Sequence, residues 1–371
     1  MLPEHVNTIF ARIRDMKLFS SFFLLLGLAA PALAGNLGFP VCMYGINAPE
    51  ELAPLKKAGF NCFQSYAQDP RKLAALAAEA QKQGLKMVIM PDKVIGSSYD
   101  AAAKDWPVLA WYLIDEPDVQ RLPKAGLEKL DKRVKDWDPA QPTTFVMGQG
   151  RAAFTYGAVA DALMVDWYPV VHLRLESVGY HVSLLKQAAK QLDAARPDKP
   201  VWAVLQAFNW LDFPQRRQPP RGRFPTRDEV RFMTYLSVLR GASGIFYFRL
   251  RNKEGQALYD NPERWAFYED TARELNALLP ALDGGERLPA PEGLDAKLAA
   301  GIVSGGGRKF LLMMNPTVKP ILVRPEALAG WRPLFVGKRD VRDSLLEYKG
   351  HWWLMPYKVL VLEKRRRFLF F

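Results

Sequence analysis

Short apolar runs alternate with longer amphipathic stretches over residues 35 to 282 of the chain. The short runs are rich in β-branched and aromatic side chains, which favour buried strands, and the longer stretches repeat their apolar residues with helical spacing. Strands are therefore predicted at 41–46, 60–65, 86–90, 108–114, 143–147, 162–166, 201–206 and 244–248. Helices are predicted at 49–58, 70–83, 123–137, 175–195, 227–240 and 261–279.

The predicted strands are apolar throughout rather than alternating, which indicates a parallel sheet covered by helices on both faces. Eight strand–helix units over 248 residues match the size of a (β/α)₈ barrel. We therefore predict an α/β protein whose residues 35–282 form a TIM barrel.

The pattern changes after Leu282, where glycines and prolines interrupt it and short strand-like runs follow. These runs lie at 297–302, 309–314, 320–323, 351–354 and 359–362. Gly305 to Gly307 are interpreted as a hairpin turn, because no helix follows them and no Lys-Ser/Thr pair completes a phosphate loop. Residues 283–363 are predicted to form a small, sandwich-like antiparallel β domain, and 364–371 a basic and apolar tail in solvent or, less favoured, on a surface.

Residues 1–34 have the pattern of a secretory leader, with Lys17, the apolar run 22–30 and the small-residue sequence Ala32-Leu33-Ala34. Residues before Met16 are interpreted as an over-extended start. Cleavage would give a secreted or periplasmic protein without a stable membrane span, and an uncleaved anchor is the alternative. In an exported protein, Cys42 and Cys62 would lie in an oxidising compartment and could form a disulfide, although we favour two buried free thiols.

Composition excludes several classes of protein. The chain is 49% hydrophobic and 24% charged, which is typical of globular proteins rather than disordered or polytopic membrane proteins. Two cysteines and four scattered histidines favour neither a disulfide framework nor a zinc site, and no metal or cofactor is expected. The net charge of +12 makes nucleic acid a partner to consider. We expect none, because the basic residues cluster in one loop and the tail and no nucleic-acid-binding module is visible.

Two adjacent carboxylates, Asp115 and Glu116, directly follow the apolar fourth strand. Active sites of TIM barrels lie at the carboxyl ends of the strands, and a carboxylic acid beside an apolar wall tends to have a raised pKa, as a general acid requires. A capping turn on the surface is the alternative interpretation.

Other strands also end in polar and aromatic residues. Those expected to bind substrate are Tyr44, Tyr66, Gln149, Trp167, Tyr168, Gln206, Trp210, Tyr247 and Arg249, with Asp166 as a further carboxylate at the end of the sixth strand. Amides and carboxylates bind sugar hydroxyls, and aromatic rings cover the apolar side of a sugar. The set therefore predicts a carbohydrate ligand.

The eight-unit layout, the sequence Trp-Tyr-Leu-Ile-Asp-Glu-Pro-Asp at 111–118 and the run Gly-Ala-Ser-Gly-Ile-Phe-Tyr-Phe at 241–248 resemble the (β/α)₈ glycoside hydrolases of the retaining cellulase and β-galactosidase clan. The resemblance implies that Glu116 is the acid/base, with Asp115 in the place of the clan's Asn. It also implies a nucleophilic Glu at the end of strand seven, where this chain has Gln206.

Three interpretations of this difference are open. Asp166 is the nucleophile or base opposite Glu116; or a substrate 2-acetamido group attacks, oriented by Asp115 and steadied by Tyr168 or Tyr247; or the protein binds sugar without cleaving it. We rank them in that order. A separation of about 5 to 5.5 Å between Glu116 and Asp166 would fit a covalent nucleophile, and about 6.5 to 9.5 Å an attacking water.

The loop after strand seven contains many arginines. They are Arg216, Arg217, Arg221, Arg223 and Arg227. Guanidinium groups bind carboxylate or sulfate, so an anionic glycan is one expected substrate, against a merely solvated loop. The sequence thus predicts an exported glycoside hydrolase with Glu116 as general acid/base and Asp166 and Asp115 beside it; the alternative is a catalytically inactive carbohydrate-binding barrel.

Overall fold

The computed structural model describes residues 38–216, 221–335 and 344–364. The predicted leader and residues 365–371 of the predicted tail lie outside this part of the chain. No helix of the described ranges is long and apolar enough to cross a bilayer.

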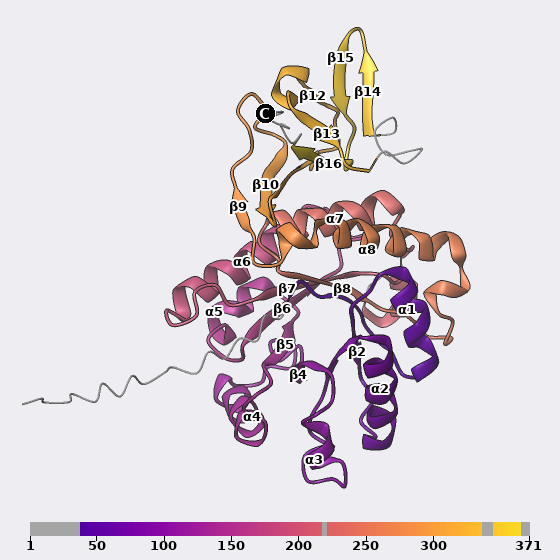
Figure 1. Ribbon diagram of the computed structural model, residues 1–371, viewed down its shortest axis with the longest axis vertical. Coiled ribbons are helices and arrows are strands. Elements are labelled where there is room, and N and C mark those ends of the chain that lie inside the picture. The colour runs from indigo at the N-terminus through magenta and orange to yellow at the C-terminus, as the bar shows by residue number, and fades with distance from the viewer. Residues whose placement is uncertain (1–37, 217–220, 336–343, 365–371) are drawn as a thin grey trace, which may run out of the picture. The chain divides into compact units, whose positions relative to one another are not determined.

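Eight parallel strands form a closed barrel in which β1 also pairs with β8. Figure 1 shows barrel strands such as β4 to β8 with the helices outside them. The strands are β1 (Val41–Met43), β2 (Cys62–Ser65), β3 (Lys86–Ile89), β4 (Val108–Asp115), β5 (Thr143–Met147), β6 (Ala162–Trp167), β7 (Val201–Gln206) and β8 (Gly244–Phe248). The predicted fold class, a TIM barrel followed by antiparallel sheets, is confirmed. Five of the predicted strand boundaries move by one to three residues at an end, and β5, β7 and β8 are as predicted.

Helices connect the strands. The α-helices are α1 (Leu52–Ala58), α2 (Pro70–Gln83), α3 (Asp100–Ala103), α4 (Lys124–Trp137), α5 (Ala153–Tyr156), α6 (Ser177–Leu192), α7 (Arg227–Leu239) and α8 (Pro262–Leu282). Their ends follow local chemistry. For example, the Asp69 side chain caps the first turn of α2, Pro70 occupies its first position, and Gly84 ends it with a φ of 63°. The four-residue helices α3 and α5 were not predicted, because they are too short to show a helical period.

The barrel has two apolar layers. The layer between strands and helices contains Trp111 and Tyr247, whereas Tyr112, Trp202 and Phe246 fill the barrel interior. These large rings close the lumen below the carboxyl ends of the strands, so a ligand can enter only at the mouth.

Cys42 and Cys62 form a disulfide, so the favoured interpretation of two free thiols was wrong. The two residues are register partners on β1 and β2, with a Cα–Cα distance of 4.6 Å. This distance lies within the range that a disulfide spans, whereas the sequence separation alone left the pairing open.

The C-terminal segment consists of a five-stranded sheet and a three-stranded sheet. Their strands are β9 (Glu286–Leu288), β10 (Ala299–Gly305), β11 (Arg308–Met314), β12 (Ile321–Val323), β13 (Trp331–Pro333), β14 (Leu345–Tyr348), β15 (His351–Leu354) and β16 (Val359–Lys364). The hairpin turn predicted between β10 and β11 is confirmed: Gly306 and Gly307 both have positive φ, as a two-residue turn requires. Strands β9, β13 and β14 were missed, since they are short and partly polar.

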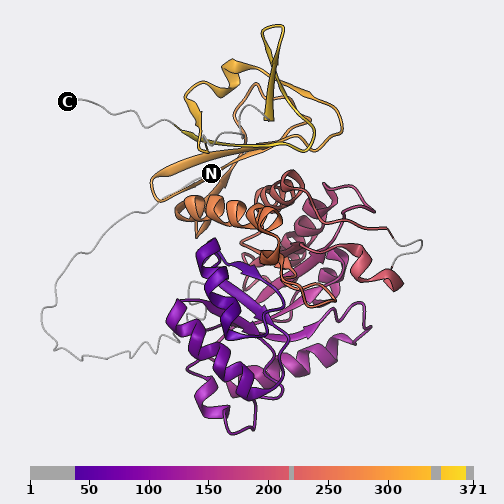
Figure 2. The same ribbon diagram turned by 90° about the vertical axis from the view of Figure 1, so that its right-hand side faces the viewer.

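Helices α7 and α8 contact the C-terminal sheet as well as the barrel strands (Figure 2). Arg231 of α7 pairs with Glu274 of α8 at 2.8 Å and donates to the carbonyl of Val359 on β16. Both side chains are more than nine-tenths buried, and Tyr235 donates a further hydrogen bond to Glu274. A buried pair with these additional hydrogen bonds fixes the helices against the sheet.

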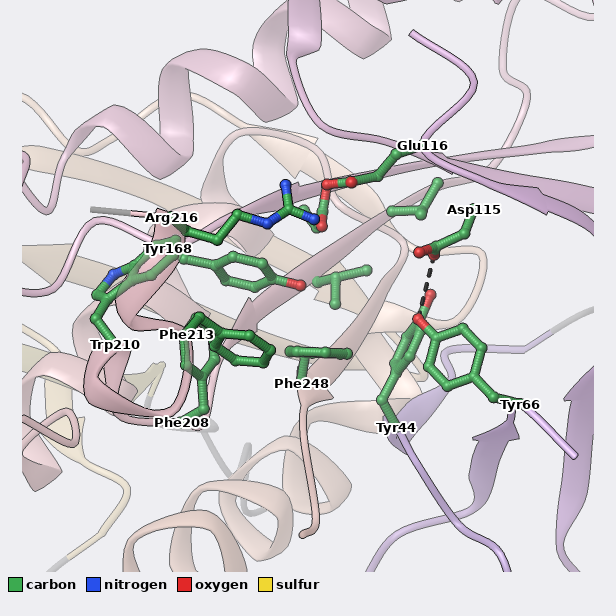
Figure 3. Close-up of a pocket in the computed structure, with 13 residues that line it drawn as sticks. Tyr44, Tyr66, Asp115, Glu116, Tyr168, Phe208, Trp210, Phe213, Arg216 and Phe248 are labelled. Carbon is green, nitrogen blue, oxygen red and sulfur yellow. Dashed lines mark hydrogen bonds between the residues drawn. The ribbon is translucent and has the colours of Figure 1, made fainter. Parts of the chain in front are cut away.

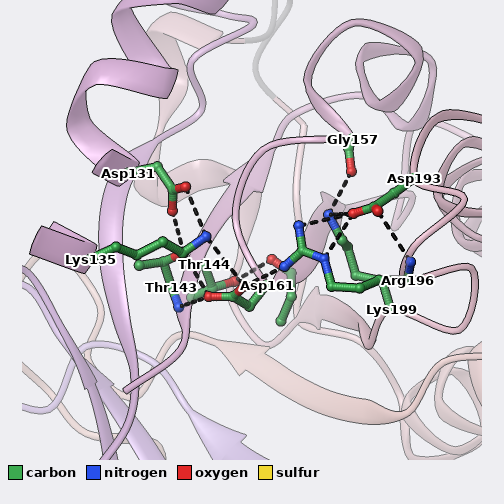
Figure 4. Close-up of polar contacts among 10 residues, drawn as sticks. Asp131, Lys135, Thr143, Thr144, Gly157, Asp161, Asp193, Arg196 and Lys199 are labelled. Carbon is green, nitrogen blue, oxygen red and sulfur yellow. Dashed lines mark hydrogen bonds and ion pairs between the residues drawn. The ribbon is translucent and has the colours of Figure 1, made fainter. Parts of the chain in front are cut away.

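The amino-terminal side of the barrel carries a network of charges, drawn in Figure 4. Lys199, just before β7, is buried and binds Asp193 at 2.9 Å and the Gly157 carbonyl at 3.0 Å. Arg196 bridges Asp193 and Asp161. Burial lowers the pKa of Lys199, with its hydrogen bond to Asp193 opposing that effect. Because this face lies opposite the mouth, the network stabilises the fold rather than binding substrate.

Candidate active site

A cavity of about 330 Å³ opens at the carboxyl ends of the barrel strands (Figure 3). Three carboxylates line it, and they are Asp115, Glu116 and Asp166. Aromatic rings and one guanidinium form most of the remaining wall, contributed by Tyr44, Tyr66, Tyr168, Phe208, Trp210, Phe213, Phe248 and Arg216. Seven of the predicted site residues therefore share this cavity: the three carboxylates, Tyr44, Tyr66, Tyr168 and Trp210.

Asp115 and Glu116 both line the cavity although consecutive strand residues point to opposite faces. The β4–β5 register shifts between Tyr112 and Asp115, where β4 advances three residues while β5 advances from Thr144 to Val146. Glu116 then adopts a φ of 44°, a left-handed conformation uncommon for a residue with a side chain. The irregular strand end thus brings both carboxylates to the same side, as bulges at active sites do.

Two phenols hold Asp115 in place. The hydroxyls of Tyr66 and Tyr112 both donate to Asp115 Oδ1, the former at 3.1 Å. Burial raises the pKa of Tyr66 and Tyr112, and the neighbouring tyrosines and the charge of Asp115 raise it further. The phenols therefore stay protonated as donors, and Asp115 serves as their acceptor through Oδ1.

Glu116 and Asp166 are hydrogen-bonded to each other through their side chains. Burial raises the pKa of Glu116, and the charge of Asp115 adds to this effect, whereas the bond to Asp166 and the charge of Arg216 oppose it. Burial and the charge of Glu116 raise the pKa of Asp166 well above its usual range. Two carboxyls in such contact cannot both ionise easily, so the pair retains one proton to a higher pH than either group would alone.

Further contacts surround this pair. The Tyr168 side chain lies close enough to lower the pKa of Asp166, whose Oδ1 atom is buried without a hydrogen-bond partner among the described residues. Figure 3 shows the Arg216 guanidinium directed toward Glu116. Gly148 leaves space beside the glutamate, since a Cβ there would lie 3.2 Å from Glu116 Oε1. The two carboxyls thus lie between the Tyr168 phenol, the Arg216 guanidinium and the backbone at Gly148.

One side of the cavity is an aromatic wall. Tyr168 stacks on Phe248 with ring centroids 5.7 Å apart, and Phe208 meets Trp210 edge to face at 5.0 Å. Phe213 extends the wall at 5.2 Å from Phe208. Aromatic surfaces of this kind suit the apolar C–H face of a sugar ring, and carboxylates suit hydroxyl groups.

Five predicted site residues lie outside this cavity. Gln206 is fully buried, and its amide bonds the backbone of Val170 through both N–H and C=O and donates to the Phe208 carbonyl. The ring of Trp167 stacks on that of His181 with centroids 3.7 Å apart, and the Trp167 indole N–H donates to the Ser177 hydroxyl.

The remaining three are placed as follows. Tyr247 is buried beneath the helices and bonds Thr234. Gln149 is exposed, and only its backbone binds Asp118. Arg249 lies over the rings of Phe213 and Phe248 and lines a neighbouring cavity.

The sequence-based site set omitted Phe208, Phe213, Phe248 and Arg216. Their signal was present, because aromatic residues directly follow strands β7 and β8 and Arg216 lies in the arginine-rich loop. Of the other arginines in that loop, Arg223 pairs with Glu229 and Arg227 with Asp270, and Arg217 lies outside the described residues.

Within the described ranges, no group of three or more His, Cys, Asp or Glu side chains is arranged to hold a metal ion. The ionisable groups that line the cavity are carboxyl, phenol and guanidinium groups.

No protein-family model and no curated protein sequence matches the chain. Solved structures match the chain. One described as a glycoside hydrolase is 17% identical with a TM-score of 0.59, over 88% of this chain and 92% of that chain. The chain shares its fold with glycoside hydrolases. A glycoside hydrolase family 5 protein from Bacteroides vulgatus has 15% identity and a TM-score of 0.58, over 88% of each chain. Eubacterium rectale Amy13B has 11% identity and a TM-score of 0.56, over 89% of this chain and 96% of that chain. At these identities the likeness establishes the fold alone.

Proposed function

We propose that the protein is a glycoside hydrolase, with Glu116 as general acid/base and Asp166 as the second catalytic carboxylate. The observation that carries the proposal is the hydrogen-bonded contact of these two carboxyls inside an aromatic-walled cavity. Glycoside hydrolysis requires one carboxyl that is protonated near neutral pH and a second that is ionised, and a pair sharing one proton supplies both.

A sugar that enters the cavity is proposed to come between the two carboxyls and separate them to the spacing that one of the two stereochemical courses needs. In the proposed course, the proton that the pair retains passes to Glu116 as the carboxyls separate, which leaves Asp166 ionised. Glu116 then gives this proton to the glycosidic oxygen as the bond to the anomeric carbon breaks. Asp166 attacks that carbon to form a glycosyl ester, which water cleaves with Glu116 as base; at the wider spacing, Asp166 instead takes a proton from the attacking water. The anomer of the first product, read by NMR, distinguishes the two courses.

Asp115 is proposed to bind and orient the substrate. Its anchoring by Tyr66 and Tyr112 fixes its direction, so that a hydroxyl or an amide of the sugar meets a preformed acceptor. In the substrate-assisted course the same oxygen would orient a 2-acetamido group, with Tyr168 rather than Tyr247 beside it, since only Tyr168 lines the cavity.

An anionic glycan is the proposed substrate class. Arg216 supports it, because this guanidinium lines the cavity and lies close enough to Glu116 to affect its pKa. Export is part of the proposal as well, because the leader-like residues 1–34 and the Cys42–Cys62 disulfide both suit an oxidising compartment. We divide the exported chain into a catalytic barrel at 35–282 and a β domain at 283–363.

Glu116→Gln tests the proposal. The amide keeps the shape of the side chain but has no proton to give, so turnover should fall about 10²- to 10⁴-fold while glycan affinity is retained. Glu347→Gln, an exposed change on β14, is the matched control and should leave turnover unchanged. The assay is release of reducing sugar from neutral and uronate-bearing glycans.

A catalytically inactive carbohydrate-binding barrel is the second candidate. Gln206 favours it, because the clan's nucleophile position holds an amide that is already bonded to backbone. Glycan binding without any release of reducing sugar by the purified protein would establish this second function and reject the first.

A further inference from the structure

A second cavity, of about 390 Å³, lies beside the first at the same end of the barrel. Its walls come from the segments that follow β7 and β8 and from the start of α8. Phe208 lines both cavities, and Arg249, which lines the second, lies over the rings of Phe213 and Phe248, which line the first. The two cavities therefore lie next to each other and are separated by aromatic rings.

Two polar atoms in this second cavity have no hydrogen-bond partner in the part of the chain that the structure describes. They are Asp212 Oδ2 and Arg249 Nε, and both are buried. The described residues include no ion pair between these two side chains. Buried polar atoms are nearly always hydrogen-bonded, since leaving one without a partner costs about 1 to 3 kcal/mol. An acceptor and a donor that remain unused in one cavity indicate a ligand that offers both.

The other charged groups of the cavity have contacts with described residues. Arg251 pairs with Glu51, and Asp260 accepts a hydrogen bond from the Ala257 backbone at 2.7 Å. Arg264 lies 3.6 Å over the ring of Phe224, forming part of the wall. Arg249 Nε and Asp212 Oδ2 are the buried donor and acceptor of this cavity that no described residue bonds.

We propose that this cavity is an accessory subsite for one sugar residue of the glycan that is cleaved beside Glu116. A sugar hydroxyl both accepts and donates, so neighbouring hydroxyls of one ring satisfy Arg249 and Asp212 together, and Phe208 lies between this ring and the first cavity. The inference rests on the proposed function and adds that the protein selects oligosaccharides long enough to occupy both cavities.

The test compares a two-sugar with a six-sugar substrate from malto-, cello-, xylo- and galacturono-oligosaccharide series. Asp212→Ala removes the acceptor, and Arg249→Lys keeps the charge but removes Nε. In each variant, the ratio of kcat/KM for six sugars to that for two sugars should fall about tenfold, because only the longer chain reaches this subsite. Asp105→Ala, exposed and just before the amino end of β4, is the matched control and should leave the ratio unchanged.

Equal losses on both lengths, or no loss, in variants with wild-type melting temperature would reject the subsite. Failure of the proposed function would give a different experimental result. If the wild type binds oligosaccharides without cleaving them, calorimetry gives the dissociation constants for six sugars and for two sugars. The ratio of these constants then tests the subsite independently of hydrolysis. A protein that neither binds nor cleaves any member of the four series rejects both proposals.

Discussion

Glu116 and Asp166 share a side-chain hydrogen bond although they come from β4 and β6, which are separated in the barrel by β5. The contact depends on the irregular end of β4, where the register shift and the left-handed backbone of Glu116 turn the side chain into the cavity. A retained proton in this pair is what the proposed chemistry needs, and it also has a cost in stability that can be measured.

Asp166→Asn should abolish most turnover and change the pH dependence of folding. The pKa of Asp166 is raised in the folded state, so the folded protein binds this proton more tightly than the unfolded chain does. Its contribution to stability is present at low pH and is lost as pH rises through the folded pKa, at about 1.4 kcal/mol per pH unit. Urea unfolding between pH 4 and 8 should therefore show the variant losing less stability with rising pH; parallel curves would contradict the assignment.

Gln206→Glu should destabilise the protein by about 3 kcal/mol and give no increase in turnover. A carboxylate cannot donate to the carbonyls of Val170 and Phe208, which the amide now satisfies in a fully buried position. Gln149→Glu, an exposed change, provides the comparison. Chemical denaturation measures both. A stable Gln206→Glu protein with increased hydrolysis would mean that strand seven supplies a nucleophile after all.

Loss of the Cys42–Cys62 disulfide should lower the free energy of unfolding. Replacing both cysteines by alanine removes a cross-link over a sequence separation of 20, worth about 3 kcal/mol in chain entropy. Reductant should lower the urea midpoint of the wild type but leave that of the double variant unchanged. Insensitivity of the wild-type midpoint would show that the bond adds nothing to folding.

His181 should make the protein less stable in acid. Burial lowers its pKa from 6.5 to about 4, with the charge of Arg151 acting in the same direction, and its Nδ1 accepts a hydrogen bond from Gly150. A lowered folded pKa gives stability that is complete above pH 6.5 and is lost as pH falls toward 4. His181→Gln keeps an acceptor without the titration, so its unfolding free energy should vary less than that of the wild type across this range.

The barrel was predictable because its determinants are local and repeated. Apolar runs such as 143–147 and 201–206 match β5 and β7 residue for residue, and caps such as Asp69 and Gly84 mark helix ends in the sequence itself. The placement of carboxylates at the mouth followed from the fold, since strand ends of a parallel barrel share one rim.

The grouping of side chains at the rim was not predictable to the same degree. Gln206 and Trp167 end strands, and Tyr247 lies one residue before the end of β8, close to the rim as Tyr168 is. These three side chains nevertheless pack inward or behind the sheet, because orientation depends on strand register and loop contacts. The Cys42–Cys62 bond likewise required the pairing of β1 with β2.

The sequence by itself therefore determined the repeating strand–helix order, the β segment after residue 282 and the carboxylates available for chemistry, because hydrophobic period and chain punctuation act over a few residues. Tertiary structure alone decided that Glu116 meets Asp166, that Asp115 is held by two phenols and that Gln206 is occupied by backbone. These relationships join residues up to 50 positions apart, and only strand register and backbone conformation bring them within a hydrogen bond.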